Sequence, residues 1–359
     1  MVQQGVRAVA ERVYLDHAAT SPLRPEAKAA MEEGFALWAN PSSPHAEGRK
    51  ARAALEDARE RIKDSLGWQG EVIFTSGASE ALALALTRAK AGARLVSSVE
   101  HDAVLQAAPG AERLPVGADG ALDLEALAEA TERERPLVAV QQINSETGCV
   151  QDLAAIVAIV SEAGGMVLAD CAQGAGKLAL PPCDMAVISA HKFGGPIGIG
   201  ALLVRDFALL EPSGGHERGY RRGTENLPGA LGMAAALEAS IAAPMVTSEM
   251  QAALDTLAEV VRGKGGVWLA DRLAQPCGYI HALAMPAMSG SAQVMRFDMA
   301  GFAVSQGSAC SSGTMKPSHV LGAMGLDAGL AANMIRVSIG WNTAPEELER
   351  FADVWASLA

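Results

Sequence analysis

The sequence predicts an α/β fold, with a large domain built on a mainly parallel β-sheet and a smaller second domain. Apolar helical stretches alternate with short β-branched runs along most of the chain, which is typical of a parallel sheet covered by helices on both faces. At 359 residues, the chain is longer than one average domain. Half of the residues are apolar and only 19% are charged, which excludes a disordered or fibrous protein.

The first 205 residues carry the predicted sheet. Residues 25–38 and 47–66 have the spacing of amphipathic helices. A strand at Glu71–Thr75 ends in Ser-Gly-Ala-Ser and is followed by an Ala/Leu-rich helix from about Glu80. The remaining predicted elements are strands at 94–98, 137–142, 166–170, 185–189 and 201–205 and a helix at 152–163. The six strands fit one sheet.

A second, smaller unit is predicted beyond about residue 230. It would contain one long Ala/Met/Leu helix at 231–263, shorter strands and a last helix from Pro345. The predicted units are a large cofactor-binding domain at 13–230, with an N-terminal arm at 1–24, and a smaller C-terminal α/β domain at 231–359 that carries the cysteine loop.

Composition also bears on partners and location. The chain has 29 Lys and Arg against 41 Asp and Glu, a net charge of -12, which disfavours nucleic acid and anionic membranes as partners. The N-terminus has an acidic residue at Glu11 and no long apolar run, so we expect neither a secretory signal nor a membrane anchor. Five cysteines without a CxxC pair argue against disulfides and a structural metal site. A cytoplasmic protein without a metal is expected.

One predicted strand-to-helix turn, 75–80, is rich in small residues. Backbone N–H groups at the helix N-terminus, together with the Ser79 hydroxyl, would face an anion such as phosphate. The alternative is an ordinary turn with a serine cap.

Two polar residues follow apolar strands. Asp170 ends one strand and Lys192 follows the next, and ligands of α/β sheets bind at the carboxyl ends of strands. Taken singly, Asp170 could be a helix cap and Lys192 a solvated surface residue. Together with the anion site, they favour pyridoxal phosphate: the lysine for its aldehyde, the aspartate for its ring nitrogen and the helix N-terminus for its phosphate.

Two further residues could take part in chemistry. His101 directly follows a strand and could transfer protons near neutral pH, although a polar loop histidine is the alternative. Cys310 lies among glycines and serines, which predicts an exposed thiol on a mobile loop. Cys171 and Cys183 have the apolar surroundings expected of buried structural thiols.

In this order, the motifs resemble those of the cysteine desulfurases, the NifS/IscS-like group of the class V pyridoxal-phosphate aminotransferase superfamily. The matching segments are YLDHAATSP at 14–22, NPSSPH at 40–45, FTSGASE at 74–80, EHDAV at 100–104, NSETG at 144–148, ADCAQGAGK at 169–177, SAHKFGGP at 189–196, GGHERGYRRGTEN at 214–226, GSACSSG at 307–313 and IRVSIG at 335–340. They span almost the whole chain. The resemblance implies a fold-type I pyridoxal-phosphate-dependent transferase.

The resemblance also implies roles for individual residues. Lys192 would hold the cofactor as a Schiff base, Asp170 would stabilise its protonated ring nitrogen, and His101 would stack on the ring as an acid/base group. The other implied cofactor contacts are Gln173 at the ring oxygen, Ala78, Ser79, Ser189 and His191 at the phosphate, Thr224 from a second subunit, and Asn144. Asn144 and Arg336 would bind the substrate carboxylate, and Cys310 would accept the sulfur.

The implied activity is conversion of L-cysteine to L-alanine, with a persulfide formed on Cys310, to supply iron-sulfur cluster or thio-cofactor assembly. A homodimer and a sulfur-acceptor protein, such as an iron-sulfur scaffold, are the implied partners. The alternative is another class V enzyme, such as a selenocysteine lyase or an aminotransferase for a small amino acid, which would not need Cys310. Departures from the family pattern at Ser145, Ile197 and Arg222 replace no proposed catalytic group.

Overall fold

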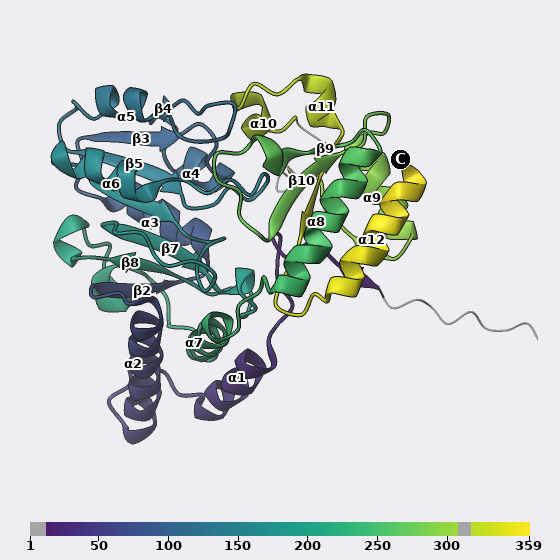
Figure 1. The fold of residues 1–359 in the computed structure, drawn as a ribbon. Helices are drawn as coiled ribbons and strands as arrows, with labels where there is room; N and C mark the ends of the chain where they lie inside the picture. Colours follow the sequence, from purple (N-terminus) through teal and green to yellow (C-terminus); the bar gives the residue numbers. More distant parts are fainter. Residues whose placement is uncertain (1–11, 308–316) are drawn as a thin grey trace, which may run out of the picture.

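A seven-stranded sheet organises the large unit of the protein. The computed structural model describes residues 12–307 and 317–359. The strands are β2 (Glu71–Thr75), β3 (Ala93–Ser97), β4 (Glu112–Leu114), β5 (Pro136–Gln141), β6 (Met166–Asp170), β7 (Met185–Ser189) and β8 (Gly200–Val204). Their order is β2-β8-β7-β6-β5-β3-β4, and only β8 runs against the others (Figure 1). The predicted α/β class and mainly parallel sheet are confirmed.

Helices cover both faces of this sheet (Figure 1). They are α1 (Pro25–Leu37), α2 (Ala46–Leu66), α3 (Ala78–Arg88), α4 (Asp102–Ala107), α5 (Leu124–Ala130), α6 (Leu153–Glu162) and α7 (Leu227–Ala242). Successive strand residues face opposite sides: Val138 joins the core under α2, α6 and α7, whereas Ala139 joins the core under α3 and α4. Burial on both faces explains why these strands are continuous apolar runs.

The predicted long helix at 231–263 is wrong. The structure has α7 and then α8 (Ser248–Gly263), separated by five residues that include Pro244. Proline has no N–H to continue a helix, and the Thr247 side chain accepts a hydrogen bond from Met250 N (3.2 Å) to start the next one. The Ala/Met-rich composition on both sides of Pro244 had hidden the break.

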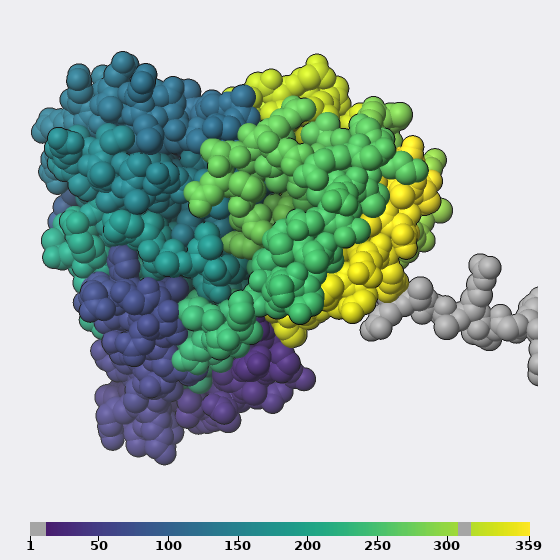
Figure 2. Space-filling view, viewed as in Figure 1, coloured from purple at the N-terminus to yellow at the C-terminus, as the bar shows by residue number. Residues whose placement is uncertain are grey.

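The small unit packs along one side of the large unit (Figure 2). Its strands are β9 (Val267–Trp268), β10 (Ile280–Ala284) and β12 (Met334–Ser338), in the antiparallel order β12-β10-β9, and β1 (Val13–Tyr14) pairs with β11 (Phe302–Ala303). Its remaining helices are α9 (Gly290–Met299), α10 (His319–Ala323), α11 (Ala328–Ala332) and α12 (Pro345–Leu358). Phe297, Phe351 and Trp355 fill its core, together with Val13 and Leu15 of the N-terminal arm.

Helix packing bears on the boundary between the two units. α7 packs on α1 and α2 and shares the core of the large sheet, whereas α8 packs on α12. The domains at 13–230 and 231–359 stay a prediction, and this packing favours a boundary in the segment 243–247. Within the described ranges, no helix is long and apolar enough to cross a membrane.

Candidate active site

The two residues singled out at strand ends meet at one edge of the sheet. β6 and β7 are hydrogen-bonded neighbours, with Asp170 opposite Val187. Asp170 is the last residue of β6, and Lys192 ends the short 3-10 helix Ala190–Lys192 that directly follows β7. Parallel strands bring their carboxyl ends to the same edge, so strand pairing itself places the carboxylate near the amine.

Asp170 is a buried carboxylate with little to balance its charge. Asp170 as a whole residue is 8% exposed, and its Oδ1 accepts a hydrogen bond from Ala172 N (3.0 Å). Across the described chain, it makes no ion pair. Burial raises the pKa of Asp170, and the hydrogen bond from Ala172 N, followed by the charges of His101 and Lys192, offsets only part of this shift. A cationic group bound beside Asp170 would restore the balance.

The N-terminal arm holds the Lys192 amine. Nζ donates hydrogen bonds to the carbonyl oxygens of Ala18 (2.6 Å) and Ala19 (2.9 Å). Gln173 Nε2 donates to the same Ala18 oxygen (2.8 Å). The arm is itself fixed, since Ser21 N donates to His191 O (2.8 Å). Residues 18–21 thus connect the small-unit core with the proposed catalytic lysine.

The predicted phosphate residues come from α3 and from the end of β7. Gly77 precedes α3 and offers no side chain to cap Ala78 and Ser79. Ser189 is buried, and the His191 ring shares a hydrogen bond with Thr20 Oγ1 (Nδ1 to Oγ1, 3.1 Å). Burial, followed by the charges of Lys192 and Lys177, lowers the pKa of His191 to about 4. An anion bound here would oppose that electrostatic shift.

His101 faces a second part of the site. It begins α4, and its Nδ1 accepts a hydrogen bond from Ala103 N (3.1 Å), so Nε2 is the nitrogen that can face a ligand. A cavity of about 1020 Å³ is lined by His101, Ser79 and Asn144, and also by Gly307 and Ser318. The last two residues flank 308–316, so the predicted acceptor Cys310 lies outside the described residues.

The predicted substrate residues are buried and already hydrogen-bonded. Asn144 donates from Nδ2 to Val99 O (3.1 Å), and its Oδ1 accepts from Glu146 N (2.9 Å). Arg336 donates from Nη1 to Ser145 O (2.8 Å) and pairs through Nη2 with Asp16 (2.7 Å). The Nε atom of Arg336 is buried without a partner among the described residues. These contacts place Arg336 and the 144–148 turn together, and their substrate role stays a prediction.

Known proteins are similar to this chain over nearly its whole length. The family model for aminotransferase class V matches residues 13–351. The chain belongs to the class V aminotransferase family. It is 36% identical to a cysteine desulfurase of Cereibacter sphaeroides, over 96% of this chain and 95% of that protein. It is 35% identical to an IscS-like cysteine desulfurase of Mycobacterium tuberculosis, over 95% and 94% of the two chains.

Solved structures of similar proteins agree with this family assignment. A NifS-like protein superposes with a TM-score of 0.87 at 27% identity, covering 97% of this chain and 99% of that one. A structure described as SspA in complex with cysteine gives 0.77 at 29% identity, covering 91% and 98%. These similarities support the predicted desulfurase activity and do not favour the alternative aminotransferase or lyase.

Class V aminotransferases of this kind use pyridoxal phosphate, and the residues present fit it. The buried Oε1 of Gln173 has no hydrogen-bond partner among the described residues, which suits a contact with the ring oxygen. Asp170 lacks a described cationic ion-pair partner, which suits the protonated ring nitrogen. The uncapped start of α3 suits the phosphate.

Thr224 is the predicted phosphate contact from a second subunit, and this role stays a prediction. It is exposed, on the segment 214–226. A buried ion pair anchors this segment: Glu217 Oε2 lies 2.9 Å from Arg59 Nη1 and also accepts a hydrogen bond from Phe74 N (2.9 Å). The segment is therefore fixed to the sheet at β2 while Thr224 faces outward.

Sequence reasoning missed several residues of the site. Asp16 pairs with Arg336, although the two lie 320 positions apart. Glu146 accepts a hydrogen bond from Ser318 Oγ (2.6 Å), which ties the 144–148 turn to the residues that follow 308–316. Glu100 is fully buried, and burial raises its pKa well above the usual value. Only the motifs YLDHAAT, NSETG and EHDAV could have drawn attention to these acids.

Proposed function

We propose that this chain is a pyridoxal-phosphate-dependent cysteine desulfurase that converts L-cysteine to L-alanine and stores the released sulfur on Cys310. The observation that carries the proposal is the meeting of Lys192 and the unbalanced, buried Asp170 at the ends of β6 and β7. This pair suits a cofactor that binds a lysine through an aldehyde and needs a carboxylate at its ring nitrogen.

When bound, pyridoxal phosphate withdraws electrons from the α-carbon of an amino acid. Asp170, kept ionised, holds the proton on the ring nitrogen that makes this withdrawal effective. The Lys192 amine would hold the cofactor and, when free, would accept the α-proton of the substrate. The arm carbonyls of Ala18 and Ala19 orient this amine, at 2.6 and 2.9 Å in the present structure. His101 supplies a second proton-transfer group near neutral pH.

Sulfur transfer requires a protein thiolate. Cys310 Sγ would form an S–S bond with the sulfur of L-cysteine while the substrate Cβ–S bond breaks. The electron pair of the broken bond stays on the substrate, which takes up a proton and leaves as alanine. The products are alanine and a Cys310 persulfide, so no external oxidant is needed.

The substrate carboxylate requires a cation near the cavity of about 1020 Å³. Arg336 is 4% exposed, and its guanidinium is oriented by Ser145 O and Asp16. We assign it, with Asn144 in the adjoining turn, to carboxylate binding. Asp16 then keeps the arginine in place before the substrate arrives.

The proposed active unit is a homodimer. Thr224 is exposed in the segment anchored by Glu217, where it can contribute to a neighbouring site. Large apolar side chains are also exposed on the same unit: Phe35 (64%), Trp38 (77%) and Ile197 (79%). Exposed apolar residues of this size are typical of subunit contacts, and two-fold dimers are the commonest oligomers. Sedimentation as a fully active monomer at micromolar concentration would contradict this assignment.

We propose that the reaction takes place in the cytoplasm. The four described cysteines, Cys149, Cys171, Cys183 and Cys277, are free and buried, which suits a reducing compartment. The persulfide sulfur would pass to an acceptor protein of iron-sulfur cluster or thio-cofactor assembly.

Product analysis tests the proposed function. The cofactor-loaded protein is mixed with L-cysteine and a thiol, and alanine and sulfide are measured; parallel samples contain L-selenocysteine or a small amino acid with a keto acid. Alanine and sulfide in equal amounts support the desulfurase. Turnover restricted to selenocysteine or to amino-group transfer would assign the alternative. Lys192→Ala is the control, since it should remove both products and the borohydride-reducible cofactor linkage.

A further inference from the structure

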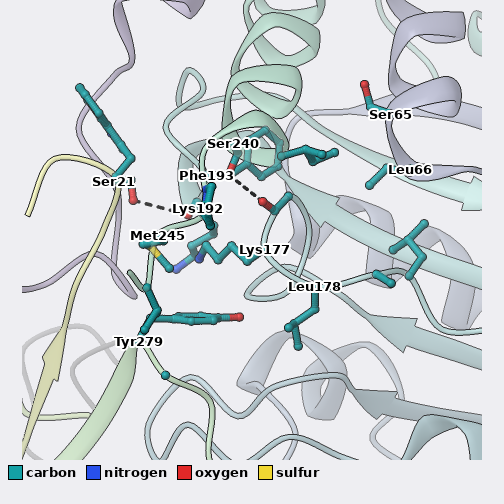
Figure 3. Close-up of a pocket in the computed structure, with 18 of the residues that line it drawn as sticks. Ser21, Ser65, Leu66, Lys177, Leu178, Lys192, Phe193, Ser240, Met245 and Tyr279 are labelled. Atoms are coloured by element: carbon teal, nitrogen blue, oxygen red, sulfur yellow. Dashed lines mark hydrogen bonds between the residues drawn. The ribbon is translucent and has the colours of Figure 1, made fainter. Parts of the chain in front are cut away.

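A second cavity, of about 710 Å³, lies beside the Lys192 segment and has an unusual charge pattern. Three cationic side chains, Arg24, Lys177 and Lys192, are among the described residues that line it, and no carboxylate is. Figure 3 shows Lys177 extending over the ring of Tyr279 toward Met245. The Lys177 nitrogen lies 4.8 Å from the ring centroid.

Neither Lys177 nor Arg24 is neutralised by an ion pair with a described carboxylate. Arg24 is 7% exposed; its Nε donates to Phe193 O (3.1 Å), and its guanidinium lies 5.1 Å from the Trp341 ring centroid. Burial lowers the pKa of Arg24, and Glu26, outside the lining, offsets only part of this shift. Burial also lowers the pKa of Lys177, to about 8.

Elsewhere, several of the buried or half-buried arginines are paired with carboxylates. Arg59 lies 2.9 Å from Glu217, Arg221 lies 3.1 Å from Glu80, and Arg336 lies 2.7 Å from Asp16. Acidic residues are also in excess, at 41 against 29 basic ones. The absence of a described carboxylate from this one lining is therefore a property of the cavity and not of the composition. Desolvated cations without a partner are costly unless an anion joins them.

We infer that this cavity binds a small organic anion, with a carboxylate or phosphate head between Lys177 and Arg24 and an apolar body on the surrounding wall. Leu178, Phe193, Met245 and Trp341 supply that wall. A volume of about 710 Å³ is in the range of small-molecule sites. The cavity shares Lys192 with the predicted cofactor site, but it shares none of His101, Asn144 and Ser79, which line the predicted substrate cavity.

Calorimetric titration of the cofactor-loaded protein tests this site. Loading fills the predicted phosphate site of the cofactor, so a phosphate probe cannot bind there. The probes are phenyl phosphate, phenylacetate and uncharged 2-phenylethanol, which share an aromatic body. At least one anion should bind saturably with one site per chain, and the neutral probe should not. The anion that binds tighter identifies the head group.

Two lysine variants locate the binding. Lys177→Met should weaken the anion about 10-fold or more, since a charge-assisted contact is lost. Lys264→Met, the same change at an exposed lysine, should leave binding unchanged. If Lys177→Met does not fold, Arg24→Gln replaces it with the same expected loss. The inference is overturned if neither anion saturates by about 10 mM, if 2-phenylethanol binds equally well, or if the lysine change has no effect.

Discussion

Two buried carboxylates in the large unit have opposite surroundings. Glu217, with its side chain 1% exposed, contacts Arg59 and accepts the N–H of Phe74. Asp170, also buried, has only the N–H of Ala172 as a described hydrogen-bond donor. The first carboxylate has its partners within the chain, whereas the second lies at the strand edge where a cofactor is predicted. A buried charge that the fold itself leaves unbalanced indicates a place for a ligand.

The buried cations near these two carboxylates also differ in whether the chain supplies a carboxylate partner. Arg59, next to Glu217, is held by two carboxylates, since Glu56 Oε2 also lies 3.3 Å from its Nε. Lys177 and Arg24, beside Lys192, face a cavity whose described lining contains none. At β2, the Arg59–Glu217 ion pair therefore fixes the segment 214–226 to the sheet. Near Lys192, the cations Lys177 and Arg24 are proposed to bind a ligand.

The Glu217–Arg59 pair should show the largest effect on stability. Glu217→Gln leaves Arg59 with its main partner removed, so we expect a loss of about 3–5 kcal/mol in the free energy of unfolding. Urea unfolding of the cofactor-free protein measures it. Glu238→Gln is the matched control, because its pair with Arg61 is far more exposed and should contribute less than about 1 kcal/mol. Equal losses in the two variants would remove the distinction drawn for Glu217.

Asp170→Asn should have the opposite effect on stability. Activity should fall about 10²–10³-fold, because the charge at the cofactor ring is lost. The cofactor-free protein should nevertheless unfold at a higher temperature, because an uncompensated buried charge is removed. The raised pKa of Asp170 means that its cost is present at neutral pH and disappears as the carboxylate is protonated at lower pH. A lower Tm at pH 7 would contradict the comparison.

Lys177→Met should stabilise the protein slightly near neutral pH. The folded pKa of about 8 lies below the usual 10.5. The buried charge therefore lowers the free energy of unfolding by its full amount below pH 8, and this loss disappears as the pH rises to 10.5. Loss of the cation–π contact with Tyr279, about 0.5–2 kcal/mol, offsets part of the gain. Thermal unfolding at pH 7 and pH 10 measures the difference. A destabilisation that is the same at both pH values would mean that the lysine is structural.

His281, in the small unit, shows that burial alone does not identify a ligand site. It is 5% exposed and stacks on Trp268 with ring centroids 4.8 Å apart, and burial lowers its pKa to about 4. Because its pKa is lowered, the His281 ring is neutral near pH 7, so no charge is buried there. Stability should therefore fall as pH drops from 6.5 to 4, and His281→Phe should reduce that fall. An unchanged pH profile in urea unfolding would show that folding does not lower the pKa of His281.

Much of this organisation could be predicted from the sequence, because local patterns determine it. Apolar runs located β2, β6 and β7 to the residue, and strand order then brought Asp170 and Lys192 together. Pairing between distant segments could not be predicted. The Asp16–Arg336 pair spans 320 residues, and the wall of the cation-lined cavity comes from at least four separate segments. The prediction of one long helix at 231–263 was wrong because the Ala/Met/Leu-rich composition was given more weight than the helix-breaking Pro244.

Cys310 is proposed to receive the sulfur of the substrate. Mass spectrometry after brief exposure of the cofactor-loaded protein to L-cysteine tests it most directly. The peptide that contains Cys310 should carry one added sulfur atom, and Cys310→Ala should keep its bound cofactor while losing nearly all alanine and sulfide formation. Full alanine production by Cys310→Ala, with no added sulfur on the wild-type peptide, would contradict the account.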